Sequence, residues 1–565
     1  MNVLTSNLKK NQSNDSAPPL HIRWLGKVHY QDALAVQESL FMAGQDNYLL
    51  LMEHFPVFTL GVNGNEANIL TDPQSIGADV LRVNRGGDVT YHGPGQLVGY
   101  PILTVPGKRG GGMADTAAYV ASVEQLIIDA LKQLGLSNCG RISQYPGVWV
   151  DPSGPSPRKI AAIGVRLSRG RSMHGFAINV NTDLSYFDAI VPCGIEGKKA
   201  TSLMEEGFQI SLRQVTDVVS ALAIANWAGG NSDRLDTAWK VQNEDLSAFS
   251  RGEGTGTHPL HVRTPEKKPE LSMSGSSTYV SLTRKPSWMK AKAKFGPEYR
   301  KIKQTMRTNQ LTTVCEEAGC PNIFECWNDG TATFMVLGDR CTRACGFCLI
   351  NTQKPLPPDS DEPKRVAEAV KTMGLEYAVV TMVARDDLYD GGAQHVADTV
   401  YAVRECNPST KIEILISDLK GDPVALERVF SSEPDVLNHN VETVLSLQRY
   451  VRPSASYTRS LAVLCRAKQY GLMTKTSIMV GLGETKKEVM SLLNDLSQVG
   501  IDIVTIGQYL SPTSSHLPIQ RWWTPEEFEE LQIYGESMGI THIESSPLTR
   551  SSYHAKQSQV IAHAT

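Results

Sequence analysis

The pattern of apolar and polar positions differs between the first and the second half of the chain. Between about residues 20 and 230, apolar runs at residues 48–53, 147–150 and 160–166 predict strands. Residues 116–134 carry apolar side chains at three- and four-residue spacing, which predicts an amphipathic helix. Because these strands and helices do not alternate regularly, we expect an α+β or mixed-sheet domain here.

After Met289 a regular alternation of strand and helix patterns begins. Repeated βα units indicate a parallel sheet, either barrel-like or doubly wound. In a barrel, functional side chains gather at the C-terminal ends of the strands. The predicted strands are residues 332–337, 377–383, 411–417, 435–441, 474–481 and 502–509, and the clearest predicted helices are residues 394–406, 455–470 and 485–499.

Composition sets the predicted domain boundaries. Residues 1–19 are polar and lack the apolar core of a secretory signal, so they indicate a disordered tail or a degenerate organellar transit peptide. We expect a first α/β domain at residues 20–228 and a second at 286–565. Residues 229–285 are rich in Gly, Ser, Thr, Pro and charge, which predicts a flexible linker, with one short helix near residues 235–249.

Charge and cysteine content narrow the possible partners and compartment. The chain has 55 basic and 59 acidic residues, so neither nucleic acid nor a membrane surface is the expected main partner. No apolar run approaches the roughly 18–20 residues that span a bilayer. Six of the ten cysteines lie between Cys315 and Cys348, a clustering that indicates metal binding in a reducing, cytoplasmic compartment rather than disulfides.

Two cysteine triplets are candidate metal ligands. Cys341, Cys345 and Cys348 have C-x3-C-x2-C spacing in GDRCTRACGFC, directly after a predicted strand. Three thiolates this close can bind three irons of one cubane cluster and leave the fourth iron open, whereas zinc would need a fourth ligand from elsewhere. Cys315, Cys320 and Cys326 have C-x4-C-x5-C spacing, and a second set of ligands implies a second task.

These triplets lie within segments that resemble lipoyl synthase from about Arg284 to Ala555. The segments are RKPSWMKAKAKFGPEYRKIKQTMRTNQLTTVCEEAGCPNIFECW, TATFMVLGDRCTRACGFC, TIGQYLSPTSSHLPIQRWWTPEEF and RSSYHA. The resemblance implies a partial (βα)6 TIM barrel of the radical-SAM type, S-adenosylmethionine bound at the C-x3-C-x2-C cluster, and a second, auxiliary [4Fe–4S] cluster that donates sulfur. In that family a serine of the R-S-S-Y motif is the fourth ligand of the auxiliary cluster, which maps to Ser551, with Ser552 as the alternative.

Weaker candidates for S-adenosylmethionine binding follow other predicted strands. Gly481, Gly483 and Glu484 join a strand to a helix, where glycines allow close approach to a nucleotide, but a simple turn is an equal reading. His439 and Asn440 end another predicted strand, and a packed, hydrogen-bonded histidine is as good an interpretation. The stretch TMVARDDLYDGG resembles a segment of the family but departs from its usual pattern at Met382 and Ala384.

The first domain contains two candidate catalytic residues, a cysteine and a lysine. Cys193 lies on a predicted turn in AIVPCGIEGKKATSL, and Lys159 precedes the apolar run IAAIGVR. A thiol becomes a nucleophile when a base or a cation stabilises its thiolate, and a lysine of lowered pKa can be that base. The residues alone do not show that the two meet.

The motifs around this pair, from about Ile22 to Leu203, resemble lipoyl(octanoyl) transferase. They are EHFPVFTLG, RGGDVTYHGPGQLVGYPI, GVWV, KIAAIGVR, HGFAINV and VPCGI, in this order. The resemblance implies the fold of biotin and lipoate ligases, Cys193 as the acyl nucleophile and Lys159 as the acid/base; His92 has a structural reading as well. The residues it places around the acyl tunnel and active site are Arg85, Gly86, Gly87, Tyr91, His92, Gly93, Gly95, Gln96, Gly164, His174 and Gly175.

The two resemblances together predict a bifunctional enzyme of lipoate biosynthesis. The first half would transfer octanoate from octanoyl-acyl carrier protein to a lysine of a lipoyl-carrier domain, such as a 2-oxoacid dehydrogenase E2 or the glycine cleavage H protein. The second would insert sulfur at C6 and C8, with electrons from ferredoxin or flavodoxin. The alternatives are an ATP-dependent lipoate or biotin ligase for the first half, and a non-catalytic iron–sulfur carrier or redox sensor for the second.

Overall fold

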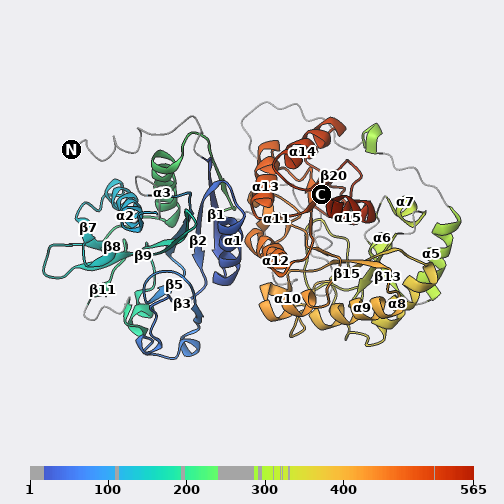
Figure 1. Cartoon of the computed structure of the whole chain (residues 1–565), viewed down its shortest axis with the longest axis horizontal. Helices are drawn as coiled ribbons and strands as arrows, with labels where there is room; N and C mark the ends of the chain where they lie inside the picture. The colour runs from blue at the N-terminus through green and yellow to red at the C-terminus, as the bar shows by residue number, and fades with distance from the viewer. Residues whose placement is uncertain are drawn as a thin grey trace. The chain divides into compact units, whose positions relative to one another are not determined.

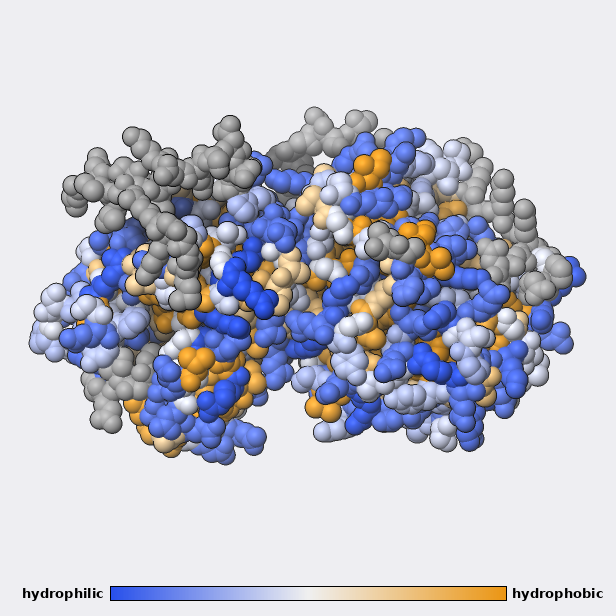
Figure 2. Space-filling view, viewed as in Figure 1, coloured by the Kyte–Doolittle hydropathy of each residue, from blue (hydrophilic) through white to orange (hydrophobic). Residues whose placement is uncertain are grey.

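The computed structural model divides the chain into two compact units, Met1–Trp239 and Lys240–Thr565, and each is described by itself (Figure 1). Figure 2 shows mostly hydrophilic residues on the visible face of each unit. No helix in the part of the chain that the structure describes is both long and apolar enough to cross a bilayer. The structure describes residues 18–107, 114–192, 198–239, 285–289, 296–308, 311–317, 320, 322–328, 331–514 and 516–564.

A mixed sheet forms the frame of the N-terminal unit. Its strands run in the order β12-β1-β2-β6-β10-β9-β8-β7, and β11 pairs with β9. The α+β prediction is therefore confirmed, and each of the three predicted strands lies in this sheet. The bounds are β1 (Leu20–Val28), β2 (Asn47–His54), β6 (Gln96–Ile102), β7 (Cys139–Ile142), β8 (Tyr145–Val150), β9 (Arg158–Ser168), β10 (Arg171–Asn179), β11 (Lys199–Ala200) and β12 (Ser232–Asp236).

Three helices pack on this sheet, and their first residues explain where two of them begin. The side chain of Asp115 accepts a hydrogen bond from the backbone of Ala118 at the start of α2, and Ser211 and Gln214 form a capping box at the start of α3. The apolar faces of α2 and α3 share one core with the sheet. The helices are α1 (Tyr30–Met42), α2 (Thr116–Gln133) and α3 (Leu212–Trp227).

A second, three-stranded sheet completes this unit. Strand β3 (Val57–Leu60) lies between β4 (Asp79–Arg82), to which it is parallel, and β5 (Val89–His92), to which it is antiparallel. Phe58, Tyr91 and the neighbouring 3₁₀ helix η3 (Leu184–Ala189) form a small core of their own. The end of this sheet meets the main sheet at His92 on β5, whose ring lies 2.8 Å from the Gln96 side chain on β6.

Strand β12 corrects the predicted linker. Residues 232–236, which we assigned to a flexible linker and partly to a short helix, instead pair in parallel with β1 at the edge of the sheet. The pattern SDRLD is too polar to indicate a strand, but tertiary contacts stabilise it. Asp233 accepts a hydrogen bond from Arg23 at 2.9 Å and contacts His21, whose other ring nitrogen lies 3.0 Å from Asp46. The rest of the predicted helix, from Lys240, lies outside the described residues.

His21 is expected to make the stability of this edge depend on pH. Burial alone would lower its pKa, but the hydrogen bonds to Asp233 and Asp46 outweigh burial and raise the pKa to about 9. A raised pKa stabilises the fold fully below the unfolded value near 6.5, and this contribution is lost as the pH rises through 9. We expect the loss to be about 1–3 kcal/mol between pH 6.5 and 10.

Urea unfolding of the N-terminal unit in the intact chain, followed from pH 6 to 10, measures this effect. His21→Gln is expected to remove most of the fall in stability with rising pH, because the glutamine side chain does not titrate in this range. Equal pH slopes in the two proteins would contradict the role assigned to His21.

Seven parallel strands form the frame of the C-terminal unit. They run from β14 to β20 in strict chain order, and β13 pairs antiparallel with β14 at one edge. A doubly wound sheet reverses its strand order at a switch point, whereas a barrel does not, so the partial-barrel prediction is confirmed. The strands are β13 (Thr312–Thr313), β14 (Ala332–Val336), β15 (Tyr377–Met382), β16 (Lys411–Leu415), β17 (Val436–Asn438), β18 (Thr474–Val480), β19 (Ile503–Gln508) and β20 (His542–Ser545).

Helices connect and cover these strands (Figure 1). All six strands and all three helices predicted from the sequence are present in this unit, with ends shifted by a few residues at most. The helices are α5 (Pro297–Thr308), α6 (Val314–Glu317), α7 (Ile323–Asn328), α8 (Glu362–Met373), α9 (Ala393–Cys406), α10 (Pro423–Phe430), α11 (Gln448–Val451), α12 (Tyr457–Tyr470), α13 (Lys486–Gln498), α14 (Pro525–Ser537) and α15 (Ala555–Ala564).

Candidate functional sites

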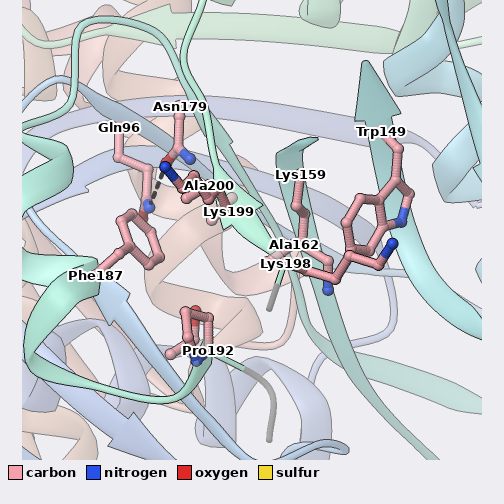
Figure 3. Close-up of a pocket in the computed structure, with 12 residues that line it drawn as sticks. Gln96, Trp149, Lys159, Ala162, Asn179, Phe187, Pro192, Lys198, Lys199 and Ala200 are labelled. Atoms are coloured by element: carbon pink, nitrogen blue, oxygen red, sulfur yellow. Dashed lines mark hydrogen bonds between the residues drawn. The ribbon is translucent and has the colours of Figure 1, made fainter. Parts of the chain in front are cut away.

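Two adjoining pockets lie in the N-terminal unit, and both are lined by β9 and β10. The first is called the lysine pocket and the second the histidine pocket. The lysine pocket is lined by Thr90, Gln96, Trp149, Lys159, Ala162, Ala177, Asn179, Phe187, Pro192, Lys198, Lys199 and Ala200 (Figure 3). The histidine pocket is lined by Tyr30, Arg85, Gly86, Gly87, Asp88, Thr90, His92, Tyr100, Ala162, Ile163, Gly164, His174, Gly175, Phe176 and Ala177.

The lysine pocket contains one of the two predicted catalytic residues, Lys159. Lys159 lies on β9, and its Nζ is 4.9 Å from the centre of the Trp149 ring on β8. Pro192, the residue before Cys193, lines the same pocket. Cys193 itself lies outside the described residues, so the geometry between its thiol and Lys159 stays a prediction. Trp149 and Asn179 were missed as site residues, although both lie in motifs that resemble the family.

The histidine pocket collects most of the predicted substrate-binding residues. Arg85, Gly86, Gly87, His92, Gly164, His174 and Gly175 line it, and Gln96 lines the lysine pocket. Tyr91, Gly93 and Gly95 line neither pocket. The Tyr91 ring stacks on Tyr186 at 4.5 Å, and Gly95 has a φ of +80° and accepts a hydrogen bond from Thr182. Contact of Tyr91, Gly93 and Gly95 with substrate therefore stays a prediction.

A chain of side-chain hydrogen bonds joins the two pockets. His92 Nδ1 lies 2.8 Å from Gln96 Oε1, and the Gln96 amide donates to Asn179 Oδ1 at 2.9 Å. Asn179 in turn donates to the carbonyl of Thr201 at 2.9 Å, and the Thr201 backbone amide donates to the carbonyl of Lys159 at 2.9 Å. The positions of His92 and Lys159 are thus coupled through Gln96 and Asn179.

Burial keeps the ionisable rings of the histidine pocket uncharged. It lowers the pKa of His92 well below its usual value and lowers that of His174 to about 3. It raises the pKa of Tyr30 to about 12. The Arg85 guanidinium donates to the carbonyl of Thr59 at 2.6 Å and to that of Gly86 at 3.0 Å, so part of its hydrogen-bonding capacity is used by the protein. Most of the rings around this pocket are therefore neutral, and its charged lining residues are Arg85 and Asp88.

In the C-terminal unit, the cysteine loop (residues 339–351) follows β14 at the C-terminal ends of the parallel strands. It carries Cys341, Cys345 and Cys348. Arg343, between the first two cysteines, donates two hydrogen bonds of 2.8 Å to Asp386, which follows β15. It also donates one of 2.6 Å to Asp418, which follows β16. Arg343 therefore attaches the loop to two neighbouring strands, a role that the spacing of the cysteines did not indicate.

The donor set of the cysteine loop fits an iron–sulfur cluster. Burial raises the pKa of the Cys345 thiol to about 12, so without a metal these cysteines are protonated, and metal binding would release the protons. Within the described ranges, no three His, Cys, Asp or Glu side chains are close enough to hold a single metal ion. The cysteines of a cubane cluster bind different iron atoms and need not meet at one point.

The first cysteine triplet lies beside the C-terminal R-S-S-Y motif. Asn322, between Cys320 and Cys326, donates to the carbonyl of Leu548 at 2.6 Å. Thr333 Oγ1 lies 3.2 Å from Ser552 Oγ. Burial lowers the pKa of Arg550, and the nearby Cys320 opposes that shift. The structure therefore brings together segments more than 200 residues apart that the family resemblance assigns to one cluster.

The weaker candidates lie at the ends of neighbouring strands. The Glu484 carboxylate accepts hydrogen bonds from Gly481, Leu482 and Trp523, at 2.5, 2.9 and 2.9 Å, and so fixes the turn after β18. Both ring nitrogens of His439 are hydrogen bonded within the protein, at 2.9 and 3.0 Å. This geometry matches the packed-histidine reading. Contacts from these residues or from Gly483 to S-adenosylmethionine remain predictions.

Asn440 differs from its neighbour His439. Its amide nitrogen donates to Glu442 at 3.0 Å, but its Oδ1 is buried and has no hydrogen-bond partner among the described residues. A buried acceptor without a partner is costly unless a ligand satisfies it. Asn440 therefore fits a bound group with a hydrogen-bond donor.

Comparison with protein families gives three matches. The model described as the lipoyl protein ligase A/B catalytic domain matches residues 29–222. The radical SAM superfamily model matches residues 335–496, and the N-terminal domain of lipoyl synthase matches residues 263–320. The first match covers the strands that line both pockets, and the second covers the cysteine loop.

Individual proteins are similar to the C-terminal half. The lipoyl synthase of Mycobacterium ulcerans is 52% identical over 291 residues, which are 52% of this chain and 90% of that protein. The lipoyl synthase of Mycobacterium tuberculosis H37Rv is 54% identical over 285 residues, 50% of this chain and 92% of that protein. A lipoate protein ligase structure from Thermoplasma acidophilum aligns with a TM-score of 0.31 and 15% identity, over 40% of this chain and 88% of that chain, and this likeness carries no argument.

Proposed function

Because the chain belongs to the lipoyl synthase family and carries a lipoyl protein ligase A/B catalytic domain before it, we propose that it performs two consecutive steps of lipoate biosynthesis. In the first, the N-terminal unit transfers octanoate from octanoyl-acyl carrier protein to a lysine of a lipoyl-carrier domain. In the second, the C-terminal unit inserts sulfur at C6 and C8 of that octanoyl group. The observation that carries the proposal is the presence of both matches on one chain.

The proposed transfer uses Cys193 and Lys159. The Cys193 thiolate attacks the thioester carbon, and the carrier's thiol leaves with a proton. The amine of the target lysine then attacks the enzyme thioester, so that an amide forms and the Cys193 thiol returns. Lys159 holds and returns the protons of these exchanges, a role supported by its place in the pocket that Pro192 also lines.

The histidine pocket is suited to the octanoyl chain. It shares Thr90, Ala162 and Ala177 with the lysine pocket, so an acyl group bound at Cys193 can extend from one into the other. Its buried histidines are neutral and would not bind water as tightly as charged rings. We assign acyl binding to the residues that line it, including Arg85, His92 and His174.

For the second step, we assign one [4Fe–4S] cluster to Cys341, Cys345 and Cys348, and an auxiliary cluster to Cys315, Cys320, Cys326 and Ser551 or Ser552. The family implies S-adenosylmethionine and iron–sulfur chemistry, which supplies the radical that removes hydrogen from unactivated carbon. The chain's own contribution is to hold the cysteine loop through Arg343 and the strand ends through Glu484. A low-potential donor such as ferredoxin or flavodoxin is the proposed source of electrons.

Two variants separate the proposed activities. Cys193→Ser is expected to abolish octanoyl transfer to a carrier domain while sulfur insertion into a pre-octanoylated carrier continues. Cys345→Ala is expected to do the reverse and to stop formation of 5′-deoxyadenosine. Each is measured anaerobically by mass spectrometry of the carrier domain and by chromatography of the nucleoside product.

Cys406→Ala, an exposed cysteine on α9, is the matched control and is expected to retain both activities. Full transfer by Cys193→Ser with ATP and free octanoate would instead establish an ATP-dependent ligase. Cluster binding without any 5′-deoxyadenosine in the unaltered chain would establish an iron–sulfur carrier or sensor.

A further inference from the structure

A third cavity of the N-terminal unit lies beside the histidine pocket. This cavity, called the outer groove, is lined by the start of α1, by the segment around the 3₁₀ helix η2 (Pro73–Ile76) and by β4. Gln31, Asp79 and Val80 lie on its wall and are exposed. The outer groove is therefore open to solvent, whereas most of the residues that line the histidine pocket are buried.

Shared lining residues place the three cavities in series. The lysine pocket and the histidine pocket share Thr90, Ala162 and Ala177. Among the described residues, the histidine pocket and the outer groove share only Tyr30, and the lysine pocket and the outer groove share none. An acyl chain that extends from the lysine pocket through the histidine pocket would therefore reach the outer groove only past Tyr30.

Three neighbouring rings hold the Tyr30 side chain at this junction. Its ring centre lies 5.0 Å from that of His54, 5.9 Å from that of His92 and 6.4 Å from that of Tyr100. His54 is itself fixed, because its ring nitrogens lie 2.9 Å from the carbonyl oxygen of Val28 and 2.7 Å from the hydroxyl of Tyr100. Tyr30 is only 4% exposed. A ring packed in this way is a firm wall, because a close-packed interior does not absorb added volume without strain.

We infer that the Tyr30 ring closes the acyl-binding pocket at its far end and so sets the longest acyl chain that the enzyme transfers. This inference rests on the proposed octanoyl transfer. A chain that fits in front of the ring gains free energy from the burial of each methylene group. A longer chain has to displace the ring, and the resulting overpacking costs free energy. Tyr30 is thus a specificity-determining residue that takes no part in the transfer chemistry.

Competition between donors of different chain length tests the inference. Equal concentrations of octanoyl- and dodecanoyl-acyl carrier protein are offered together with a carrier domain as the acceptor, and mass spectrometry gives the ratio of dodecanoyl to octanoyl product. Tyr30→Val is expected to raise this ratio at least about tenfold, because the longer chain can then enter the outer groove. Both products form in the same sample, so a loss of folded protein cancels in the ratio.

Three further variants separate the ring from its surroundings. Tyr30→Leu fills more of the space than valine does, so it is expected to raise the ratio less, and it keeps the test informative if the valine variant does not fold. Tyr30→Phe loses only the hydroxyl group and is expected to keep the ratio of the unaltered chain. Gln31→Ala changes an exposed residue of the outer groove and is expected to leave the ratio unchanged.

Other outcomes overturn the inference in distinguishable ways. An unchanged ratio in the valine and leucine variants, with both products formed, would show that the Tyr30 ring is not the wall. An equal rise in Tyr30→Phe would assign the effect to the hydroxyl group instead of the ring. Equal dodecanoyl and octanoyl transfer by the unaltered chain would show that the pocket is not closed. If the unaltered chain transfers neither acyl group, the proposed function itself fails.

Discussion

Replacement of Arg343 by methionine is expected to lower the free energy of unfolding of the C-terminal unit by about 3–5 kcal/mol. The Asp418 side chain is fully buried, and its Oδ1 accepts the 2.6 Å hydrogen bond from Arg343. Burial opposes ionisation of Asp418, but the charge of Arg343 holds the pKa of Asp418 well below its usual range. Without the guanidinium, a buried carboxylate has lost its main counter-charge, and that cost appears as lost stability.

The same substitution is expected to reduce the iron retained by the chain after gel filtration, because the loop with Cys341 and Cys345 loses its attachment to two strands. Urea unfolding of the metal-free chain measures the first effect, and iron analysis with the visible spectrum of the reconstituted chain measures the second. Arg340→Met is the matched control, since Arg340 is partly exposed and lies 3.8 Å from the more exposed Asp339. Unchanged stability together with normal iron content would contradict the attachment role.

Replacement of Lys475 by methionine is expected to destabilise the same unit by a similar amount, about 3–5 kcal/mol. Lys475 on β18 and Glu413 on β16 are almost completely buried, and the lysine Nζ lies 3.1 Å from both carboxylate oxygens. Tyr377 and Asn438 also donate to Glu413, each at 2.9 Å. Removing the only cation of this group leaves Glu413 charged in the interior or forces it to take up a proton.

A paired substitution separates the buried charge from the loss of packing. Lys475→Met/Glu413→Gln removes both charges. The glutamine carbonyl can still accept from Asn438, and its amide group can donate to the Tyr377 hydroxyl, so the double variant is expected to recover most of the lost stability. Lys411→Met removes a half-exposed lysine on β16 that pairs with Asp435, and it is expected to cost less than about 1 kcal/mol. A double variant as unstable as Lys475→Met would show that packing, not charge, dominates.

The sequence predicted strands best where both faces of the strand are buried. Strands of a parallel sheet are covered on both faces and appear as nearly continuous apolar runs, which is why β14 to β19 were predicted. Strands β13, β20 and β12 were missed because they are short or polar. Strands β1, β6 and β10 were also not predicted, although most of their residues are buried. The polar strand β12 depends on Asp233 meeting His21 and Arg23, residues that lie about 210 positions away, and no local pattern indicates such contacts.

The cysteine loop and the N-terminal pockets also differ in how far the sequence predicts them. The cysteine loop is local, so its spacing alone indicated metal binding. The N-terminal pockets combine side chains from β5, β8, β9 and β10, and no spacing along the chain indicates that His92, Lys159 and His174 line adjoining cavities. Arg343, Asn179 and Lys198 became visible only through contacts or pocket lining. The charge partners of Arg343 are Asp386 and Asp418, which lie 43 and 75 positions away along the chain.

The edge position of β12 has a mechanical consequence. This strand is the last described element before residue 240, and it pairs only with β1, at the end of the main sheet. Strands β1, β2, β6 and β10 separate it from β9, which carries Lys159. A pull on the chain beyond Trp239 therefore acts first on the short β12–β1 ladder, while Lys159 on β9 lies four strands further into the sheet.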